Sequence, residues 1–261
     1  MEGNKVSELE PTQRFTDRVE NYVKYRPHYP LAFFEFLEST CGLGAESSVA
    51  DIGSGTGIAT EPLLKLGCRV YAVEPNDAMR AAAEAKLGKV SGFRSINGTA
   101  EHSRLSQACV HLVLAAQAFH WFDTLKARAE FQRILEPEGW VVLLWNERIG
   151  SATPFLEAYE RLLRDFGTDY QKVRHDNVTE TATIGAFFGK GGHHTVSFPN
   201  KQILDFEGLK GRLLSSSYVP KASDPKYEPM LVELKAIFEK HNESGKVSLL
   251  YDTKAYYGRL T

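Results

Sequence analysis

Short apolar runs alternate with amphipathic segments over the first half of the chain. Val49–Ile52 is apolar apart from one carboxylate, and Trp140–Trp145 is an unbroken apolar run. Such runs are typical of strands that are buried on both faces of a parallel sheet. Five of them, alternating with helices, predict an α/β fold with a doubly wound sheet. The predicted strands are Val49–Ile52, Cys68–Val73, Ser91–Ile96, Cys109–Ala116 and Trp140–Trp145, and the predicted helices are Leu31–Cys41, Glu61–Leu66, Pro75–Leu87 and Leu125–Leu135.

The sequence changes character beyond Arg148. Pro154–Phe166 carries large apolar side chains at helical spacing, which predicts an amphipathic helix. Positions 176–192 are polar and contain several glycines, so a loop is expected there. Strand-like patterns return twice more in the remainder of the chain. These predicted strands are Thr195–Phe198 and Gln202–Phe206, joined through Pro199–Asn200, and finally Val247–Tyr257.

Gly53, Gly55 and Gly57 directly follow the first predicted strand and precede a helix. Glycine lets the main chain turn tightly and leaves no Cβ between it and a ligand, while the helix presents N–H groups that lack partners. The dinucleotide-binding pattern requires its third glycine at position 58, where this chain has Ile58, so that pattern is absent. The second predicted strand ends at Glu74, whose carboxylate can accept hydrogen bonds from both hydroxyls of a ribose.

Asp51, the Gly-x-Gly-x-Gly turn and Glu74 together resemble the S-adenosylmethionine (SAM) site of class I methyltransferases. The resemblance is to the type 11 group, in a small-molecule branch that includes trans-aconitate methyltransferase-like proteins. It covers roughly positions 15–148 and is strongest at Val49–Trp145. It implies a Rossmann-like, doubly wound, mostly parallel sheet of seven strands, with two final antiparallel strands at its edge. It also implies a small helical cap, formed by Gly208–Ser217 and Pro229–His241.

The same resemblance implies which residues contact SAM. Tyr25–Pro30 resembles a segment that closes over the SAM pocket in this branch, and Tyr22 also matches that pattern. For Tyr25 a packing role, and for Arg26 a role as a surface cation, are the alternatives. In the family the loop after the third strand contacts the adenine, often through an aspartate where this chain has Thr99. The cofactor-binding residues expected on these grounds are Tyr25, Arg26, Asp51, Gly53, Ser54, Gly55, Gly57, Glu74, Pro75, Thr99, Ala100, Glu101 and Gln117.

Gln117 and His120 follow the fourth predicted strand and are the candidate catalytic residues. In open parallel sheets a ligand lies beyond the carboxyl ends of the strands, where the strand order reverses. Gln117 is therefore expected to face the methionine end of SAM or the methyl acceptor. His120 stands between large aromatic residues, where both a packing role and a role as a base are open. Ser215–Tyr218 is either a polar helix end or part of the pocket lining.

The expected function is SAM-dependent methyl transfer to a small-molecule acceptor, either a carboxylate or a hydroxyl. This in-line displacement depends on alignment of the reactants and exclusion of water. It requires no metal, and no metal-ligand spacing stands out in the sequence. A carboxylate acceptor would need no base and could pair with Arg26 or Arg148, whereas a hydroxyl or amine would use His120. An NAD(P)-dependent oxidoreductase and a non-catalytic SAM-binding module remain as alternatives.

Composition limits the remaining possibilities. The 261-residue chain has a formal charge of −2, and it lacks the concentrated basic surface that binding to nucleic acid requires. Cys41, Cys68 and Cys109 are widely separated, which is typical of buried thiols in a reducing compartment. No signal peptide or membrane span stands out, so a cytoplasmic protein is expected, with its oligomeric state left open. The expected organisation is a disordered segment at 1–14, a SAM-binding core at 15–148, and cap helices with the final strands at 149–261.

Overall fold

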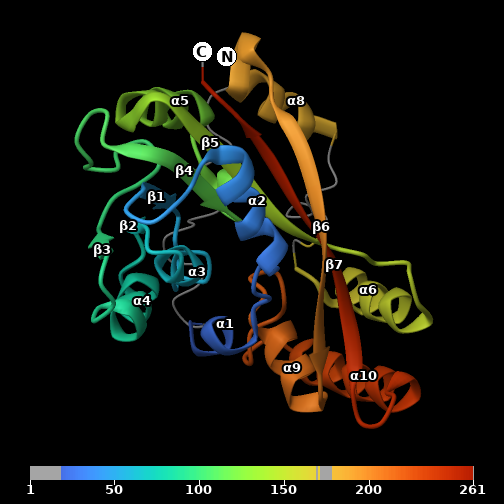
Figure 1. Ribbon diagram of the computed structural model, residues 1–261. Helices are drawn as coiled ribbons and strands as arrows, with labels where there is room; N and C mark the ends of the chain where they lie inside the picture. Colours follow the sequence, from blue (N-terminus) through green and yellow to red (C-terminus); the bar gives the residue numbers. More distant parts are fainter. Residues whose placement is uncertain (1–18, 169, 171–177, 261) are drawn as a thin grey trace.

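A seven-stranded sheet with the order β3-β2-β1-β4-β5-β7-β6 forms the centre of the molecule (Figure 1). The computed structural model describes residues 19–168, 170 and 178–260. The segment expected to be disordered, 1–14, lies outside the described residues. The strands are β1 (Ser48–Ile52), β2 (Arg69–Val73), β3 (Phe93–Ile96), β4 (Val110–Ala116), β5 (Leu135–Arg148), β6 (His194–Leu204) and β7 (Val247–Gly258).

The strand directions confirm a doubly wound, mostly parallel sheet and correct one detail. The strands β1 to β5 pair in parallel, and β1 lies between β2 and β4, so the strand order reverses there. At the other edge β7 is antiparallel to both β5 and β6. Only β7 therefore runs against the others, because β6 has the same direction as β5. The prediction that both final strands are antiparallel to the sheet was wrong for β6.

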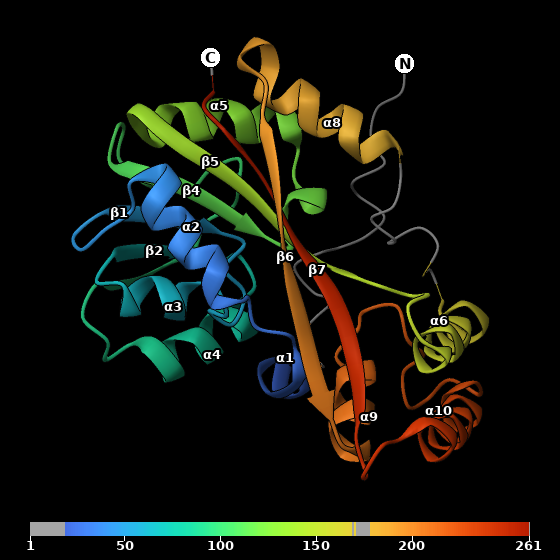
Figure 2. The ribbon, with the colours of Figure 1, turned by 45° about the vertical axis from the view of Figure 1, so that its right-hand side comes forward.

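Helices cover both faces of the sheet, and three more form a separate cap (Figure 2). On one face α2, α3 and α4 pack against alternate strand residues, and on the other face α5 and α8 do so. The cap helices α6, α9 and α10 share a third apolar core with β6 and β7. The helices are α1 (Val19–Tyr25), α2 (Leu31–Cys41), α3 (Thr60–Lys65), α4 (Asp77–Leu87), η3 (Phe119–Trp121), α5 (Thr124–Ile134), α6 (Pro154–Phe166), α8 (Val178–Phe188), η4 (Gly189–Gly191), α9 (Phe206–Leu214) and α10 (Tyr227–His241).

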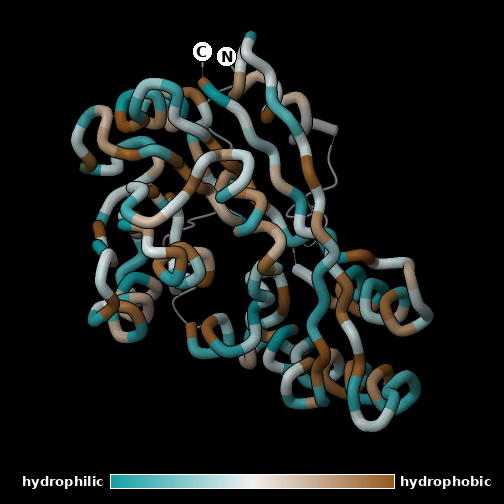
Figure 3. The backbone as a smooth tube through the Cα atoms, viewed as in Figure 1, coloured by the Kyte–Doolittle hydropathy of each residue, from teal (hydrophilic) through white to brown (hydrophobic). Residues whose placement is uncertain are grey.

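Local sequence accounts for where several helices begin. The side chains of Asn76, Asp123 and Thr153 each accept a hydrogen bond from a main-chain N–H in the first turn of the following helix. In α6 the buried side chains are those of the predicted apolar face together with Glu160, and Pro154 stands at the start, where a missing N–H costs nothing. The helical segments carry both brown and teal bands in Figure 3, as expected for helices with one face on a core.

Three further expectations were wrong in detail. The helix α8 and the turn η4 occupy Val178–Gly191, within the region expected to be a loop. The two strands predicted around Pro199 are one strand, β6. Its Pro199 lies on an edge strand, where its missing N–H interrupts little. The turn expected at Glu136–Gly139 lies inside β5, at an irregularity where the pairing passes from Val110–Leu135 to Leu112–Trp140.

No helix in the described part of the chain is both long enough and apolar enough to span a membrane.

Candidate functional site

The glycine turn lies at the carboxyl end of β1, where the sheet order reverses. Gly53, Gly55 and Gly57 all have positive φ angles, of 71°, 56° and 82°, which side-chain-bearing residues rarely adopt. A Cβ on Gly53 would lie 2.6 Å from Ala118 Cβ, and one on Gly57 would lie 2.7 Å from Leu87 Cδ1. A Cβ on Gly55 would have no atom within 4 Å. A side chain at Gly53 would therefore clash with Ala118, one at Gly57 would displace the end of the Leu87 side chain, and Gly55 faces open space.

Glu74 at the end of β2 is hydrogen-bonded to this turn. Its Oε2 accepts a hydrogen bond from Gly55 N at 2.9 Å, and its Oε1 accepts one from Asn76 N at 2.8 Å. Burial raises the pKa of Glu74, while these main-chain bonds act in the opposite direction. Each carboxylate oxygen can accept a second hydrogen bond. Glu74 therefore holds Gly55 in place and keeps acceptor capacity beside it.

A pocket of about 850 Å³, including solvent at its mouth, is lined in part by Gly55 and Glu74. We call it the glycine pocket. It combines main-chain surface, one carboxylate and apolar side chains such as Met79 and Phe122, which is typical of sites for small molecules. The sequence-predicted residues that line it are Gly53, Gly55, Glu74, Pro75, Thr99, Ala100, Glu101 and Gln117.

Five residues expected to bind the cofactor do not line the glycine pocket. Asp51, Ser54 and Gly57 belong to β1 or to the turn, but their side chains or Cα atoms lie outside the lining. The Tyr25 ring packs against Gly211 of α9, and Tyr25 does not line the glycine pocket. A second pocket lies beside the glycine pocket, and Tyr25 does not line that one either. Arg26 lines that second pocket. Tyr22, which lies on α1 with Tyr25, lines both pockets.

Asp51 is fully buried beneath the turn. Its Oδ2 accepts a hydrogen bond from Thr60 Oγ1 at 2.6 Å, and its Oδ1 has no hydrogen-bond partner among the described residues. Burial raises the pKa of Asp51 to about 7, although the Thr60 bond opposes this; the charge of Glu74 raises it further. In the absence of a ligand Asp51 is therefore close to half protonated at neutral pH.

This pKa predicts a pH-dependent stability. The folded chain holds the Asp51 proton more tightly than the unfolded chain, whose carboxyl titrates near 3.8. The protonated Asp51 therefore contributes fully to the stability of the folded chain below about pH 4, and this contribution is lost as the pH rises through about 7. We expect Asp51→Asn to remove up to about 4 kcal/mol of pH-dependent stability over this range. Melting temperatures of the apoprotein from pH 4 to 8 measure it, with the exposed Asp77→Asn as control. Equal slopes in wild type and Asp51→Asn would contradict the assignment.

Gln117 stands where the two pockets meet. It follows β4 directly and has a φ of 58°, which is uncommon for a residue with a side chain and is often found at functional sites. Its main-chain N–H donates to Leu144 O at 2.8 Å, and its Nε2 donates to Asn146 O at 3.4 Å. Gln117 lines both pockets, as do Tyr22 and Trp121. His120 lines the second pocket, with its ring 4.6 Å from that of Trp121.

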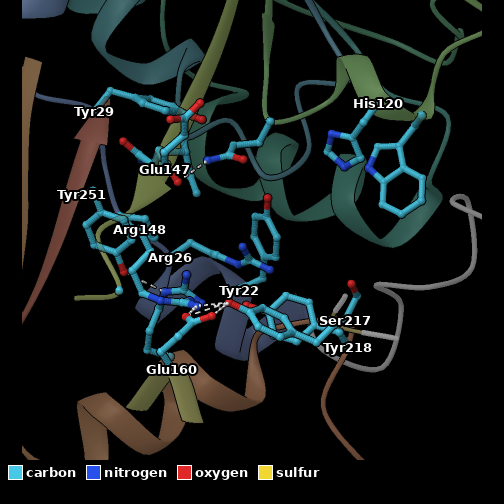
Figure 4. Close-up of a pocket in the computed structure, with 18 residues that line it drawn as sticks. Tyr22, Arg26, Tyr29, His120, Glu147, Arg148, Glu160, Ser217, Tyr218 and Tyr251 are labelled. Carbon is cyan, nitrogen blue, oxygen red and sulfur yellow. Dashed lines mark hydrogen bonds and ion pairs between the residues drawn. The ribbon is translucent and has the colours of Figure 1, made fainter. Parts of the chain in front are cut away.

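The second pocket, which we call the arginine pocket, lies between the sheet and the cap (Figure 4). Its volume is about 1,100 Å³, including solvent at its mouth. Arg26 comes from the segment after α1, Arg148 from the end of β5 and Arg212 from α9. Ser217 and Tyr218, from the predicted serine run, also line it. Figure 4 shows His120 on one side of the cavity and Glu160 with Tyr251 on the other.

The sequence did not single out Arg212 or Trp121 as site residues. An arginine in the last turn of a helix resembles an ordinary surface cation, yet Arg212 is only 5% exposed. Its place depends on packing between α9 and β7, which are far apart in the sequence. Spacing along the chain carries no signal for such a contact.

Sequence comparison shows which known proteins the chain is similar to. A model of the family described as "Methyltransferase domain" matches residues 50–143, which include the glycine turn, Glu74 and Gln117. An uncharacterized methyltransferase-like protein of Schizosaccharomyces pombe is 26% identical over 250 residues, which are 93% of each chain. These similarities support a class I SAM-dependent methyltransferase. The same similarities support a methyltransferase enzyme rather than an oxidoreductase.

A further relative and a solved structure are also similar to this chain. An uncharacterized methyltransferase of Mycobacterium tuberculosis is 37% identical over 134 residues, which are 51% of this chain and 52% of that protein. That alignment thus spans about half the length of the relative. A solved methyltransferase from Anaeromyxobacter dehalogenans shares the fold with a TM-score of 0.69 and 21% identity, over 90% of this chain and 98% of that one.

A SAM-dependent methyltransferase from Geobacter sulfurreducens, solved with S-adenosylhomocysteine, has a TM-score of 0.53 and 14% identity. The match covers 97% of this methyltransferase and 99% of that chain. These similarities confirm the Rossmann-like sheet that the sequence predicted. The narrower resemblance to trans-aconitate methyltransferase-like proteins stays a prediction.

Proposed function

We propose that the methyltransferase binds SAM in the glycine pocket and a small-molecule acceptor in the arginine pocket, and that it transfers the methyl group between them. The observation that carries this proposal is that the two pockets share Tyr22, Gln117 and Trp121. A ligand in one pocket and a ligand in the other would therefore meet at a common wall. This is the arrangement that a direct transfer between two bound molecules requires.

The glycine pocket fits a sulfonium nucleoside. The open space at Gly55 leaves room for a ligand against the main chain, and Glu74 beside it offers acceptor capacity to the ribose hydroxyls. Ala100 and the side chain of Met79 supply apolar surface for a flat base, with Thr99 and Glu101 at the same edge. When bound there, SAM supplies a methyl group that is activated by the positive sulfur.

The chain's own residues would orient the reactants and exclude water. Gln117 faces both pockets, and its strained main chain is held by Leu144, so it would contact the methionine end of the cofactor or the acceptor. Tyr22 and Trp121 would shield the meeting point from solvent. An acceptor carboxylate would need no base, whereas for a hydroxyl His120 lies in the same cavity to take the proton.

The test has a binding step and a turnover step. Calorimetry is expected to show binding of SAM and S-adenosylhomocysteine, with NADH as the control ligand. Release of S-adenosylhomocysteine is then followed with a panel of small acids, phenols and amines. Binding of NADH but not SAM would refute the proposal. SAM binding without turnover of any acceptor would leave the non-catalytic module as the better description.

A further inference from the structure

Two of the three arginines in the arginine pocket have no carboxylate partner among the described residues. Arg148 is neutralised, because its Nη2 donates to Glu160 Oε2 at 2.8 Å and lies 2.6 Å from the hydroxyl of Tyr170. That hydroxyl in turn donates to Glu160 at 2.8 Å. Arg148, Glu160 and Tyr170 thus form one hydrogen-bonded network, in which Glu160 is the ion-pair partner of Arg148. Glu160 is therefore not an ion-pair partner of Arg26 or Arg212.

The guanidinium groups of Arg26 and Arg212 converge on the end of α9. Arg26 Nη2 donates to Ser215 O at 2.9 Å, and Arg212 Nη1 lies 3.4 Å from Ser215 Oγ and 3.1 Å from Ser216 Oγ. Arg212 Nε donates to the hydroxyl of Tyr251 at 3.2 Å. All of these acceptors are neutral. Arg26 Nε is buried and has no partner among the described residues.

The charges around these two arginines leave a positive excess. The lining of the arginine pocket holds Arg26, Arg148 and Arg212 against Glu147 and Glu160. Glu160 pairs with Arg148, and the charge of Glu147 acts on Lys254 of β7. Burial, and then the charge of Arg212, lower the pKa of Arg26, so these surroundings disfavour the charged form of Arg26. Keeping unpaired cations in a buried site is costly, and such sites are often functional.

We infer that Arg26 and Arg212 form an anion-binding subsite that holds an acidic group of the acceptor, at a distance from the atom that is methylated. The ligand is a small oxyanion-bearing molecule, with a carboxylate or a phosphate ester as the group held. The fork of an arginine side chain suits both, because it donates two parallel hydrogen bonds. The inference takes the arginine pocket as the acceptor site of the proposed function, but anion binding itself requires no methyl transfer.

The two ends of the arginine pocket are lined by different parts of the fold, which supports binding of the acidic group at one end and methyl transfer at the other. Gln117 and Trp121, which border the glycine pocket, lie with His120 near the carboxyl end of β4. Arg212 and Tyr251 come from the cap and from β7. Figure 4 shows Tyr251 and His120 on opposite sides of the cavity. An acceptor held by its acidic group at the cap would therefore present its other end to the transferring methyl.

The test measures the binding of small anions to the protein loaded with S-adenosylhomocysteine. The probes are succinate, benzoate and phenyl phosphate, with succinamide and benzamide as neutral matches, and binding is followed by ligand-observed NMR. We expect the anions to bind more tightly than the amides. Arg26→Gln and Arg212→Gln should each weaken anion binding about 10- to 100-fold. Arg164→Gln, which removes an exposed arginine from α6, is the matched control and should change nothing.

The outcomes separate the subsite from the proposed function. Preference for carboxylates or for phenyl phosphate identifies which oxyanion the subsite takes, and either result supports the inference. Equal binding of acids and amides, or unchanged affinity in both arginine variants, would overturn it even if SAM binds normally. If SAM does not bind, the proposed function fails while anion binding to the unloaded protein still tests the subsite. Arg212 is buried, so Arg26→Gln carries the test if Arg212→Gln does not fold.

Tyr218 provides an independent spectroscopic readout. Burial alone would raise the pKa of Tyr218, but Arg148, Arg212 and Arg26, together with a hydrogen bond to Ser216, lower it to about 8. A bound anion would offset the arginine charges and move this pKa upward. The phenolate absorbance of wild type minus that of Tyr218→Phe isolates the group during a pH titration. Saturating succinate or phenyl phosphate should shift the titration to higher pH, and an unchanged midpoint with both anions would contradict the subsite.

Discussion

Replacing Gly55 with valine is expected to abolish SAM binding while the fold persists. Gly55 is the glycine of the turn whose added Cβ meets no atom within 4 Å, so a side chain there would project into the glycine pocket. The valine methyl groups would occupy the space that the ligand needs against the main chain. We expect the affinity to fall by more than about 100-fold, which corresponds to more than about 2.7 kcal/mol. Calorimetry with SAM and S-adenosylhomocysteine measures this loss.

The backbone strain of this substitution can be separated from its effect on the pocket. Gly55 has a φ of 56°, so valine costs about 1 to 2 kcal/mol of stability wherever the new side chain points. Gly245 offers a matched control, because it has a φ of 77°, also meets no atom within 4 Å, and lies in an exposed turn before β7. Gly245→Val should lose similar stability and keep full affinity. Normal SAM binding by a folded Gly55→Val variant would refute the placement of the ligand.

Removal of the Glu74 carboxylate is expected to have the second largest effect. Glu74→Ala takes away the acceptor offered to the ribose and also the group that holds Gly55 N and Asn76 N. Each hydrogen bond to a charged group contributes about 1.5 to 3 kcal/mol. The affinity of Glu74→Ala for SAM should therefore be lower than that of the wild type by about 100-fold or more. Glu74→Gln retains one acceptor oxygen, so its affinity should lie between those of the wild type and Glu74→Ala.

An analogue of the ligand distinguishes the two roles of Glu74. S-adenosylhomocysteine and its 2′,3′-dideoxy analogue are compared in wild type and in Glu74→Gln, as a double-mutant cycle. If the carboxylate binds the ribose, the variant loses much more affinity for the natural ligand than for the analogue. Equal losses for both ligands would mean that Glu74 acts only by holding the turn.

The core of the fold could be predicted because its signals are local. The apolar run before Gly53, the glycines themselves and the acid after the next strand are each readable within a few residues of sequence. The helix α6 has the predicted bounds, since Thr153 caps it and its apolar face is regular. By contrast, α8 was expected to be a loop, because its start is polar and it contains Gly185. Its buried Phe187 and Phe188 pack on the sheet, and this tertiary contact outweighs the local preference.

The candidate site also contains residues that local sequence predicts and residues that depend on tertiary packing. Residues that directly follow strands, such as Gly55, Glu74 and Gln117, line the pockets as expected, because parallel strands end at one edge of the sheet. The cap end of the arginine pocket depends on how α9 packs against α1 and β7. Tyr25 was expected to bind the cofactor but is held against Gly211, while Tyr22, three residues earlier on α1, faces both pockets. Without the packing of α1 on α9, the sequence does not distinguish the two tyrosines.

The wall formed by Tyr22, Gln117 and Trp121 has a thermodynamic consequence. Because both cavities rest on the same three side chains, occupancy of one fixes surface that the other must use. Any coupling that results is reciprocal: an acceptor that strengthens cofactor affinity by some factor must itself gain that same factor from the cofactor. Where such coupling exists, acceptor affinity differs between the cofactor-loaded and the empty protein, so acceptors should be screened on the loaded form.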